Sequence, residues 1–175
     1  MKQLLLFRHA KSSWDQPALD DHSRPLAERG RMAAPAMARR LSELDLVPDL
    51  VLCSDSARTL ETWDLLSEVW GETSRSPHVE IRPDLYLASP RGIVSAVRTS
   101  APEASTVMVV AHNPGLHDVS QILSRPEDTS EYHRMVRKFP TGAVAVIQCD
   151  IENWTSLDRD DNRLLHFIRP KDLGR

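Results

Sequence analysis

The chain of 175 residues lacks the features that define several large classes of protein. It has only two cysteines, Cys53 and Cys149, and neither has a Cys or His nearby at zinc-ligand spacing. Both lie in apolar stretches, which indicates two buried thiols and a reducing, cytoplasmic location rather than a disulfide framework. No apolar run reaches the length of a signal peptide or a membrane span. The formal net charge of -3 provides no overall basic field, which argues against general nucleic-acid binding.

What the sequence does contain is an alternation of apolar runs and helix-period segments, typical of an α/β fold with a mostly parallel sheet. We expect one domain over residues 1–175, built as a three-layer α/β/α sandwich with about six strands, one of them antiparallel. The strands are expected near residues 4–7, 50–53, 79–81, 106–111, 143–149 and 164–168. Helices are expected near residues 25–41, 57–70, 90–97 and 115–123.

Two local features refine this prediction. Pro35 lies inside the first helical segment and is expected to kink or divide the helix. The polar stretch Glu152–Arg163 suits a hairpin better than a crossover helix, so the last strand is expected to be the antiparallel one.

Polar residues of a consistent kind follow three of the expected strands. Arg8 and His9 end the first strand, Arg58 opens the helix after the second, and His112 follows the strand 106–111. The carboxyl ends of parallel strands share one edge of a sheet, which is where α/β proteins bind ligands. The free N–H groups of a helix start also favour an anion. Two arginines and two histidines at this edge therefore predict a phosphate site.

The motifs that hold these residues resemble those of the histidine phosphatase superfamily, which has the phosphoglycerate-mutase-like fold. They are Arg8-His9-Ala10 at the end of the first strand, Arg24-Pro25-Leu26-Ala27-Glu28-Arg29-Gly30, Ser54-Asp55-Ser56-Ala57-Arg58-Thr59-Leu60-Glu61-Thr62, and Val109-Val110-Ala111-His112-Asn113. They occur in the family's order, from the first strand to at least residue 124.

The resemblance implies a role for each matching residue. His9 is the expected nucleophile, which takes the phosphoryl group as a covalent phosphohistidine. Arg8, Arg58 and His112 are expected to bind the phosphate oxygens, where charge is stabilised during transfer. The attacking nitrogen of His9 must be unprotonated, so a backbone acceptor is expected to hold the other nitrogen. This scheme uses no metal ion and no cofactor.

The sequence departs from the family pattern at two positions. Ala10 replaces the motif glycine, which requires a backbone conformation that alanine can adopt. Many relatives carry a glutamate general acid after the third strand; here Asp84 is the nearest carboxylate, and it is either that acid or a turn residue after Pro83. A phosphohistidine leaves as an imidazole and needs less protonation than an alkoxide, which favours a phosphoramidate substrate. The compact chain with a weak acid position resembles the SixA-type phosphohistidine phosphatases.

Other residues near the motifs have two interpretations each. Lys11 and Trp14 are expected at the rim of the pocket, as substrate contacts or as ordinary surface residues. Asn113 either binds phosphate or stabilises the turn before Pro114. Ser54 either contacts phosphate or caps the following helix. Short connections after the strands indicate an open site that could admit a protein side chain.

Three functions therefore remain open at the level of sequence. The first is a metal-independent phosphatase that acts on phosphohistidine in a partner protein. The second is hydrolysis of a small phosphomonoester, and the third is a phosphate-binding module without turnover. No membrane partner and no nucleic acid are expected, and the sequence leaves the oligomeric state open.

Overall fold

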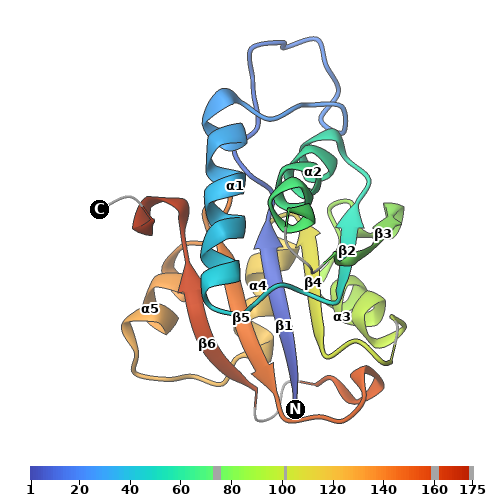
Figure 1. Ribbon diagram of the computed structural model, residues 1–175, viewed down its shortest axis with the longest axis vertical. Helices are drawn as coiled ribbons and strands as arrows, with labels where there is room; N and C mark the ends of the chain where they lie inside the picture. Colours follow the sequence, from blue (N-terminus) through green and yellow to red (C-terminus); the bar gives the residue numbers. More distant parts are fainter. Residues whose placement is uncertain (73–75, 101, 159–161, 174–175) are drawn as a thin grey trace.

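The computed structural model describes residues 1–72, 76–100, 102–158 and 162–173, and is organised around one six-stranded sheet (Figure 1). The strand order is β3-β2-β4-β1-β5-β6. The bounds of the strands are Lys2–Arg8 (β1), Leu50–Ser54 (β2), His78–Arg82 (β3), Thr106–Ala111 (β4), Val144–Cys149 (β5) and Arg163–Ile168 (β6). The expected α/β fold with a sheet of six strands is confirmed, and it is the phosphoglycerate-mutase-like fold.

The direction of the strands corrects one expectation. β1, β2, β3 and β4 are parallel, whereas β5 pairs antiparallel with β1 and β6 pairs antiparallel with β5. The expected hairpin between β5 and β6 is present, but the strand that opposes the others is β5, and β6 again runs with β1. The reason is where β5 begins: the N–H of Gly142, just before it, donates to the carbonyls of Arg8 and His9 (3.0 and 2.9 Å) at the carboxyl end of β1.

Helices cover both faces of the sheet (Figure 1). Their bounds are Glu28–Glu43 (α1), Ala57–Gly71 (α2), Pro90–Arg98 (α3), Gly115–Leu123 (α4) and Ser130–Arg137 (α5). Successive side chains of a strand point to opposite faces, so Leu5 and Phe7 of β1 pack with α1 and α2, whereas Leu4 and Leu6 pack with α3, α4 and α5. This division of the core gives the three layers that the sequence predicts.

Two helices differ from the prediction. α1 runs through Pro35 as one undivided helix, because packing of Met37 and Leu41 against the sheet stabilises it more than one missing backbone hydrogen bond weakens it. Met32, Met37 and Leu41 recur at helical spacing in the sequence of this segment, but Met32 is exposed. α5 was not predicted, since this helix is short, consists mostly of polar residues and buries only Met135.

The composition led to expectations about the two cysteines and about membrane-spanning segments. Cys53 and Cys149 are both buried and free, as predicted. Within the described residues, no helix combines the length and the apolar character that crossing a lipid bilayer requires.

Candidate active site

The ends of three neighbouring strands bring the predicted phosphate-binding residues together. β1 lies beside β4, and β4 lies beside β2, with all three running in the same direction. Their carboxyl ends therefore meet at one edge, at the upper side of the sheet in Figure 1. The rings of His9 and His112 lie 5.3 Å apart between centroids, and a guanidinium nitrogen of Arg58 lies 3.2 Å from His112 Nδ1. Residues separated by more than 100 positions thus form one cluster.

His9 is held in the form that a nucleophile needs. It is 6% exposed, and its Nδ1 lies 2.7 Å from the carbonyl oxygen of Ala10. A carbonyl oxygen only accepts hydrogen bonds, so Nδ1 carries the proton and Nε2 keeps its lone pair. Burial, assisted by the positive charges of Arg58 and Arg8, lowers the pKa of His9 to about 4, although the bond to Ala10 acts in the opposite direction. The imidazole is therefore neutral at pH 7, with the backbone acceptor that the sequence predicts.

Ala10 fits the place of the motif glycine without backbone strain. The non-glycine residues with positive φ in the described chain are Asp45 and Leu87, so Ala10 has a conformation open to any residue. Its methyl group packs in a small buried cluster with Leu26, and its N–H donates to Thr62 Oγ1 at 3.0 Å. The substitution leaves the end of β1 intact.

Arg58 reaches the site from the first turn of α2 and is 5% exposed. Besides its contact with His112, it donates to the carbonyl of Asp21 and, at 2.9 Å, to the carboxylate of Asp21. The same carboxylate oxygen accepts from the hydroxyl of Tyr86 at 2.7 Å. The Tyr86 hydroxyl, more than the Arg58 guanidinium, lowers the pKa of Asp21. Sequence reasoning missed both Asp21 and Tyr86, since neither belongs to a strand-end motif.

His112 is buried, and each of its two ring nitrogens has a hydrogen-bond partner. Its Nδ1 accepts from Arg58, so in the neutral ring Nε2 carries the proton and donates to Ser54 Oγ at 2.8 Å. Burial, followed by the nearby His9 and Arg58, lowers the pKa of His112 to about 3, which keeps this tautomer neutral. Ser54 thus supports His112, and the residue at the N-cap position of α2 is Ser56. In this arrangement Nδ1 of His112 accepts from Arg58 and so orients its guanidinium.

Arg8 and Asn113 share one backbone acceptor. Arg8 Nη1 and the side-chain nitrogen of Asn113 donate to the carbonyl of Phe139, at 2.8 and 3.0 Å. Burial and the charge of Arg58 lower the pKa of Arg8, which remains a cation at neutral pH. Its Nε is buried without a hydrogen-bond partner among the described residues, a donor that a phosphate oxygen would satisfy. This bond uses one of the two N–H groups of the Asn113 amide, so both interpretations of Asn113 are compatible with the geometry.

Asp84 lies in a different setting from the other candidates. Its carboxylate is 57% exposed and accepts two hydrogen bonds from Arg82, at 2.8 and 2.9 Å. These hydrogen bonds lower the pKa of Asp84. A carboxylate held ionised by an arginine is a poor proton donor unless substrate draws that arginine away, and within the described structure neither Arg82 nor Asp84 pairs with the residues of the His9 cluster. The structure therefore favours the second interpretation, a surface residue of the turn Pro83–Leu85.

The loop between β1 and α1 carries the predicted rim residues and encloses the site. Lys11 is exposed, and Trp14, 62% exposed, stacks on the guanidinium of Arg24 with 4.2 Å from Cζ to the ring centroid. This loop projects above the sheet in Figure 1, and its Asp21 reaches back to Arg58. The cluster around His9 is consequently more enclosed than the short connections after the strands suggest.

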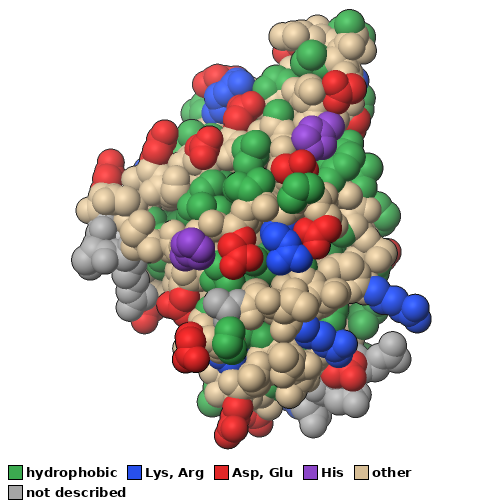
Figure 2. All heavy atoms as spheres, turned by 90° about the vertical axis from the view of Figure 1, so that its right-hand side faces the viewer, with side chains coloured by type: hydrophobic (Ala, Val, Ile, Leu, Met, Phe, Trp, Pro, Cys, Tyr) green, Lys and Arg blue, Asp and Glu red, His purple; other side chains and the backbone are tan. Residues whose placement is uncertain are grey.

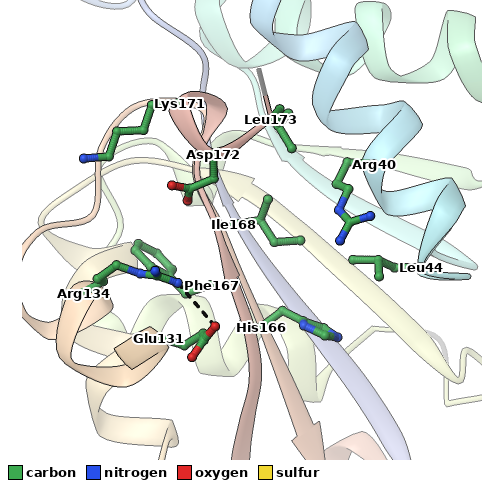
Figure 3. A pocket seen from close by; sticks show the side chains of 10 residues that line it. All are labelled: Arg40, Leu44, Glu131, Arg134, His166, Phe167, Ile168, Lys171, Asp172 and Leu173. Carbon is green, nitrogen blue, oxygen red and sulfur yellow. Dashed lines mark hydrogen bonds and ion pairs between the residues drawn. The ribbon is translucent and has the colours of Figure 1, made fainter. Parts of the chain in front are cut away.

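A separate groove of about 630 Å³ follows the edge strand β6 (Figure 3). Residues of α1, α5, β6 and the segment 171–173 line it. Its basic and acidic side chains are mixed, and Arg134 pairs with Glu131 at 3.4 Å. Within the described ranges, no group of three or more His, Cys, Asp or Glu is arranged to hold a metal ion.

A neutral histidine with a free Nε2, two arginines and a second histidine at the carboxyl edge of a parallel sheet define a class of phosphate-handling α/β protein. The comparisons with known proteins agree with this. The chain belongs to the Histidine phosphatase superfamily (branch 1), whose sequence model matches residues 4–86, including Arg8, His9 and Arg58.

Several relatives extend the match along the chain. An uncharacterised chloroplastic protein of Arabidopsis thaliana is 37% identical over 133 residues, which are 70% of this chain; the chain spans only 59% of the length of that relative. An uncharacterised protein of Mycobacterium tuberculosis is 29% identical over 94% of this chain and 99% of its own length.

Among solved structures, similar folds are found in proteins assigned as SixA phosphohistidine phosphatases. The protein from Nakamurella multipartitia has a TM-score of 0.83 and 28% identity, over 97% of this chain and 96% of its own. The protein from Agrobacterium tumefaciens has a TM-score of 0.79 and 26% identity, over 97% and 98%.

Proposed function

We propose that this protein is a metal-independent phosphatase that transfers a phosphoryl group to His9 and then to water, with phosphohistidine in a protein as its substrate. The observation that carries the proposal is the imidazole of His9, whose Nδ1 donates to the Ala10 carbonyl and whose Nε2 is left as a lone-pair nucleophile. Its low pKa keeps this nitrogen ready for attack at neutral pH.

The neighbouring residues supply the charge that phosphoryl transfer needs. Arg8 and Arg58 would neutralise the equatorial oxygens while Nε2 of His9 bonds to phosphorus and the leaving atom departs with its electron pair. His112 would hold Arg58 in place and offer Nδ1 to a protonated phosphate oxygen once Arg58 turns to the substrate. Water then attacks phosphorus, the bond to Nε2 breaks, and its electron pair returns to His9.

A protein substrate is supported by the surface around the cluster. The face on the β3 side of the molecule carries exposed hydrophobic side chains among charged ones (Figure 2). Ile81 and Leu87 are the large exposed apolar residues of this segment, and Trp14 adds another on the projecting loop. Exposed apolar groups next to a site are typical of surfaces that receive another protein. The similarity to proteins assigned as SixA phosphohistidine phosphatases points to the same substrate.

The test is to trap the intermediate. A ³²P-labelled phosphohistidine peptide, quenched within milliseconds, should leave acid-labile label on the wild type and none on His9→Asn. Turnover should survive a chelator such as EDTA. Wild-type protein that neither takes up label nor releases phosphate would refute the proposal and favour the binding module.

A small phosphomonoester is the second candidate, and the burial of the cluster favours it. His9, Arg58 and His112 are each more than nine-tenths buried, as suits a small ligand. Comparing kcat/KM for a phosphohistidine peptide with that for an alkyl phosphate separates the two. A clear preference for the alkyl phosphate would replace the protein substrate with a metabolite.

A further inference from the structure

The loop between β1 and α1 places a carboxylate on the guanidinium that the proposed function assigns to phosphate. Asp21 Oδ2 accepts from Arg58 at 2.9 Å and from the Tyr86 hydroxyl at 2.7 Å. The Asp21 side chain is 49% exposed, so one side of the carboxylate faces Arg58 and the other is open to an incoming molecule.

A chain of ring contacts joins this carboxylate to the nucleophile. The Tyr86 ring lies edge-on to His112, with 5.4 Å between centroids, and His112 lies 5.3 Å from His9. The negative charge of Asp21 also acts on both histidines and opposes the fall of their pKa values. Asp21 is thus close enough to influence the atoms that react.

Contacts of the next residue, His22, fix the position of Asp21. The carbonyl of His22 accepts from the N–H of Ala57 at 3.0 Å, and the His22 imidazole contacts the Asp55 carboxylate at 2.9 Å. These contacts fix the loop to the start of α2. They also occupy an N–H at the helix start that could otherwise have faced an anion. The loop therefore places the Asp21 carboxylate at the start of α2, beside Arg58.

We propose that Asp21, rather than Asp84, is the carboxyl group that moves the proton in this phosphatase. The inference rests on the proposed function of His9. In the first step Nε2 of His9 bonds to phosphorus, the bond from phosphorus to the leaving atom breaks, and that atom takes the proton from the Asp21 carboxyl. In the second step the Asp21 carboxylate takes a proton from the attacking water, the bond to Nε2 breaks, and hydrogen phosphate leaves.

Substrate itself would prepare Asp21 for this role. Before phosphate arrives, the Tyr86 hydroxyl and Arg58 lower the pKa of the carboxyl. A bound phosphate competes for the donors of Arg58 and adds negative charge beside Asp21, and both changes raise the pKa of a carboxyl. Asp21 would then take up a proton when substrate binds and give it to the leaving group.

The experiment compares leaving groups in five proteins: wild type, Asp21→Asn, Asp21→Glu, Asp84→Asn and the control Asp20→Asn. Asp20 is the adjacent exposed carboxylate, which hydrogen-bonds to Ser23 within the same loop. We expect Asp21→Asn to lose roughly 10²–10⁴-fold in kcat/KM on an alkyl phosphate, as for loss of a general acid. On p-nitrophenyl phosphate, whose leaving group needs little protonation, the loss should be much smaller, with a burst of nitrophenol.

Two further readouts separate proton transfer from simple anchoring of the loop. Phosphohistidine should accumulate on His9 in Asp21→Asn, because water has lost its base, and Asp21→Glu should recover part of the activity. Equal losses on every leaving group without accumulation, or full activity of Asp21→Asn, would overturn the inference while the proposed function stands. A selective loss in Asp84→Asn instead would assign the proton to Asp84. Wild-type protein without turnover or label would overturn both proposals.

Discussion

The burial of a neutral His9 makes a quantitative prediction about acid stability. The pKa of His9 is about 4 in the folded chain, against 6.5 for an unperturbed histidine. Between these values the unfolded chain binds a proton on this residue that the folded chain does not bind. The contribution of His9 to stability is therefore complete above pH 6.5 and is lost as the pH falls toward 4. The full loss is about 3 kcal/mol, at about 1.4 kcal/mol per pH unit in the middle of this window.

The perturbation that isolates this effect is His9→Gln, which removes the titrating ring. Urea unfolding at several pH values between 7.5 and 4.5 gives the free energy of unfolding of each protein. We expect the wild-type value to fall more steeply with acid, by about 1.4 kcal/mol per pH unit below pH 6 relative to the variant. His112, whose pKa is about 3, steepens both curves in the same way and cancels in the difference.

A surface histidine provides the control. His78 is exposed at the start of β3, so His78→Gln corrects for the removal of one histidine in general. Stability curves of wild type and His9→Gln that stay parallel from pH 7 to pH 4.5 would refute the reasoning, because His9 would then not be held neutral by the fold.

Three further results are expected. Arg58→Lys keeps the charge but loses the planar donor pair, and should weaken phosphate binding by roughly 10–100-fold in calorimetric titrations; unchanged affinity would remove Arg58 from the site. Burial raises the pKa of both thiols, that of Cys149 to about 12, so Cys53 and Cys149 should resist a thiol reagent until urea unfolds the chain; rapid labelling of the native protein would contradict their burial. Gly115→Ala should cost about 1–3 kcal/mol of stability by urea unfolding, because the new methyl group overlaps a neighbouring backbone carbonyl, whereas Gly71→Ala has open space. Equal stabilities of these two variants would show that the close packing at α4 can relax.

The sequence determined the sheet and the core of the site because both depend on local patterns. A run of apolar residues between polar breaks is enough to specify a buried strand, and Thr106–Ala111 appears with the bounds that the pattern predicts. Parallel strands then fix where their ends lie. This is why Arg8, His9, Arg58 and His112 could be grouped before their geometry was known.

Other features depended on contacts that no local pattern records. The antiparallel strand is β5 because Gly142 begins it at the carboxyl end of β1, and a hairpin signal alone does not give direction relative to the rest of the sheet. α5 is short and mostly polar, and the burial of its Met135 depends on packing with distant parts of the core. The pairing of Asp84 with Arg82 became visible only as a pair of hydrogen bonds in space.

The clearest case is the surroundings of Arg58. The sequence determined that a cation stands at the start of α2, where phosphate chemistry needs one. Only the tertiary structure decided that Asp21, 37 positions away, accepts from Arg58, and that Tyr86, 65 positions from Asp21, donates to the same carboxylate. The physical reason is that a loop without periodicity is positioned by its long-range contacts, here those of His22 with Ala57 and Asp55.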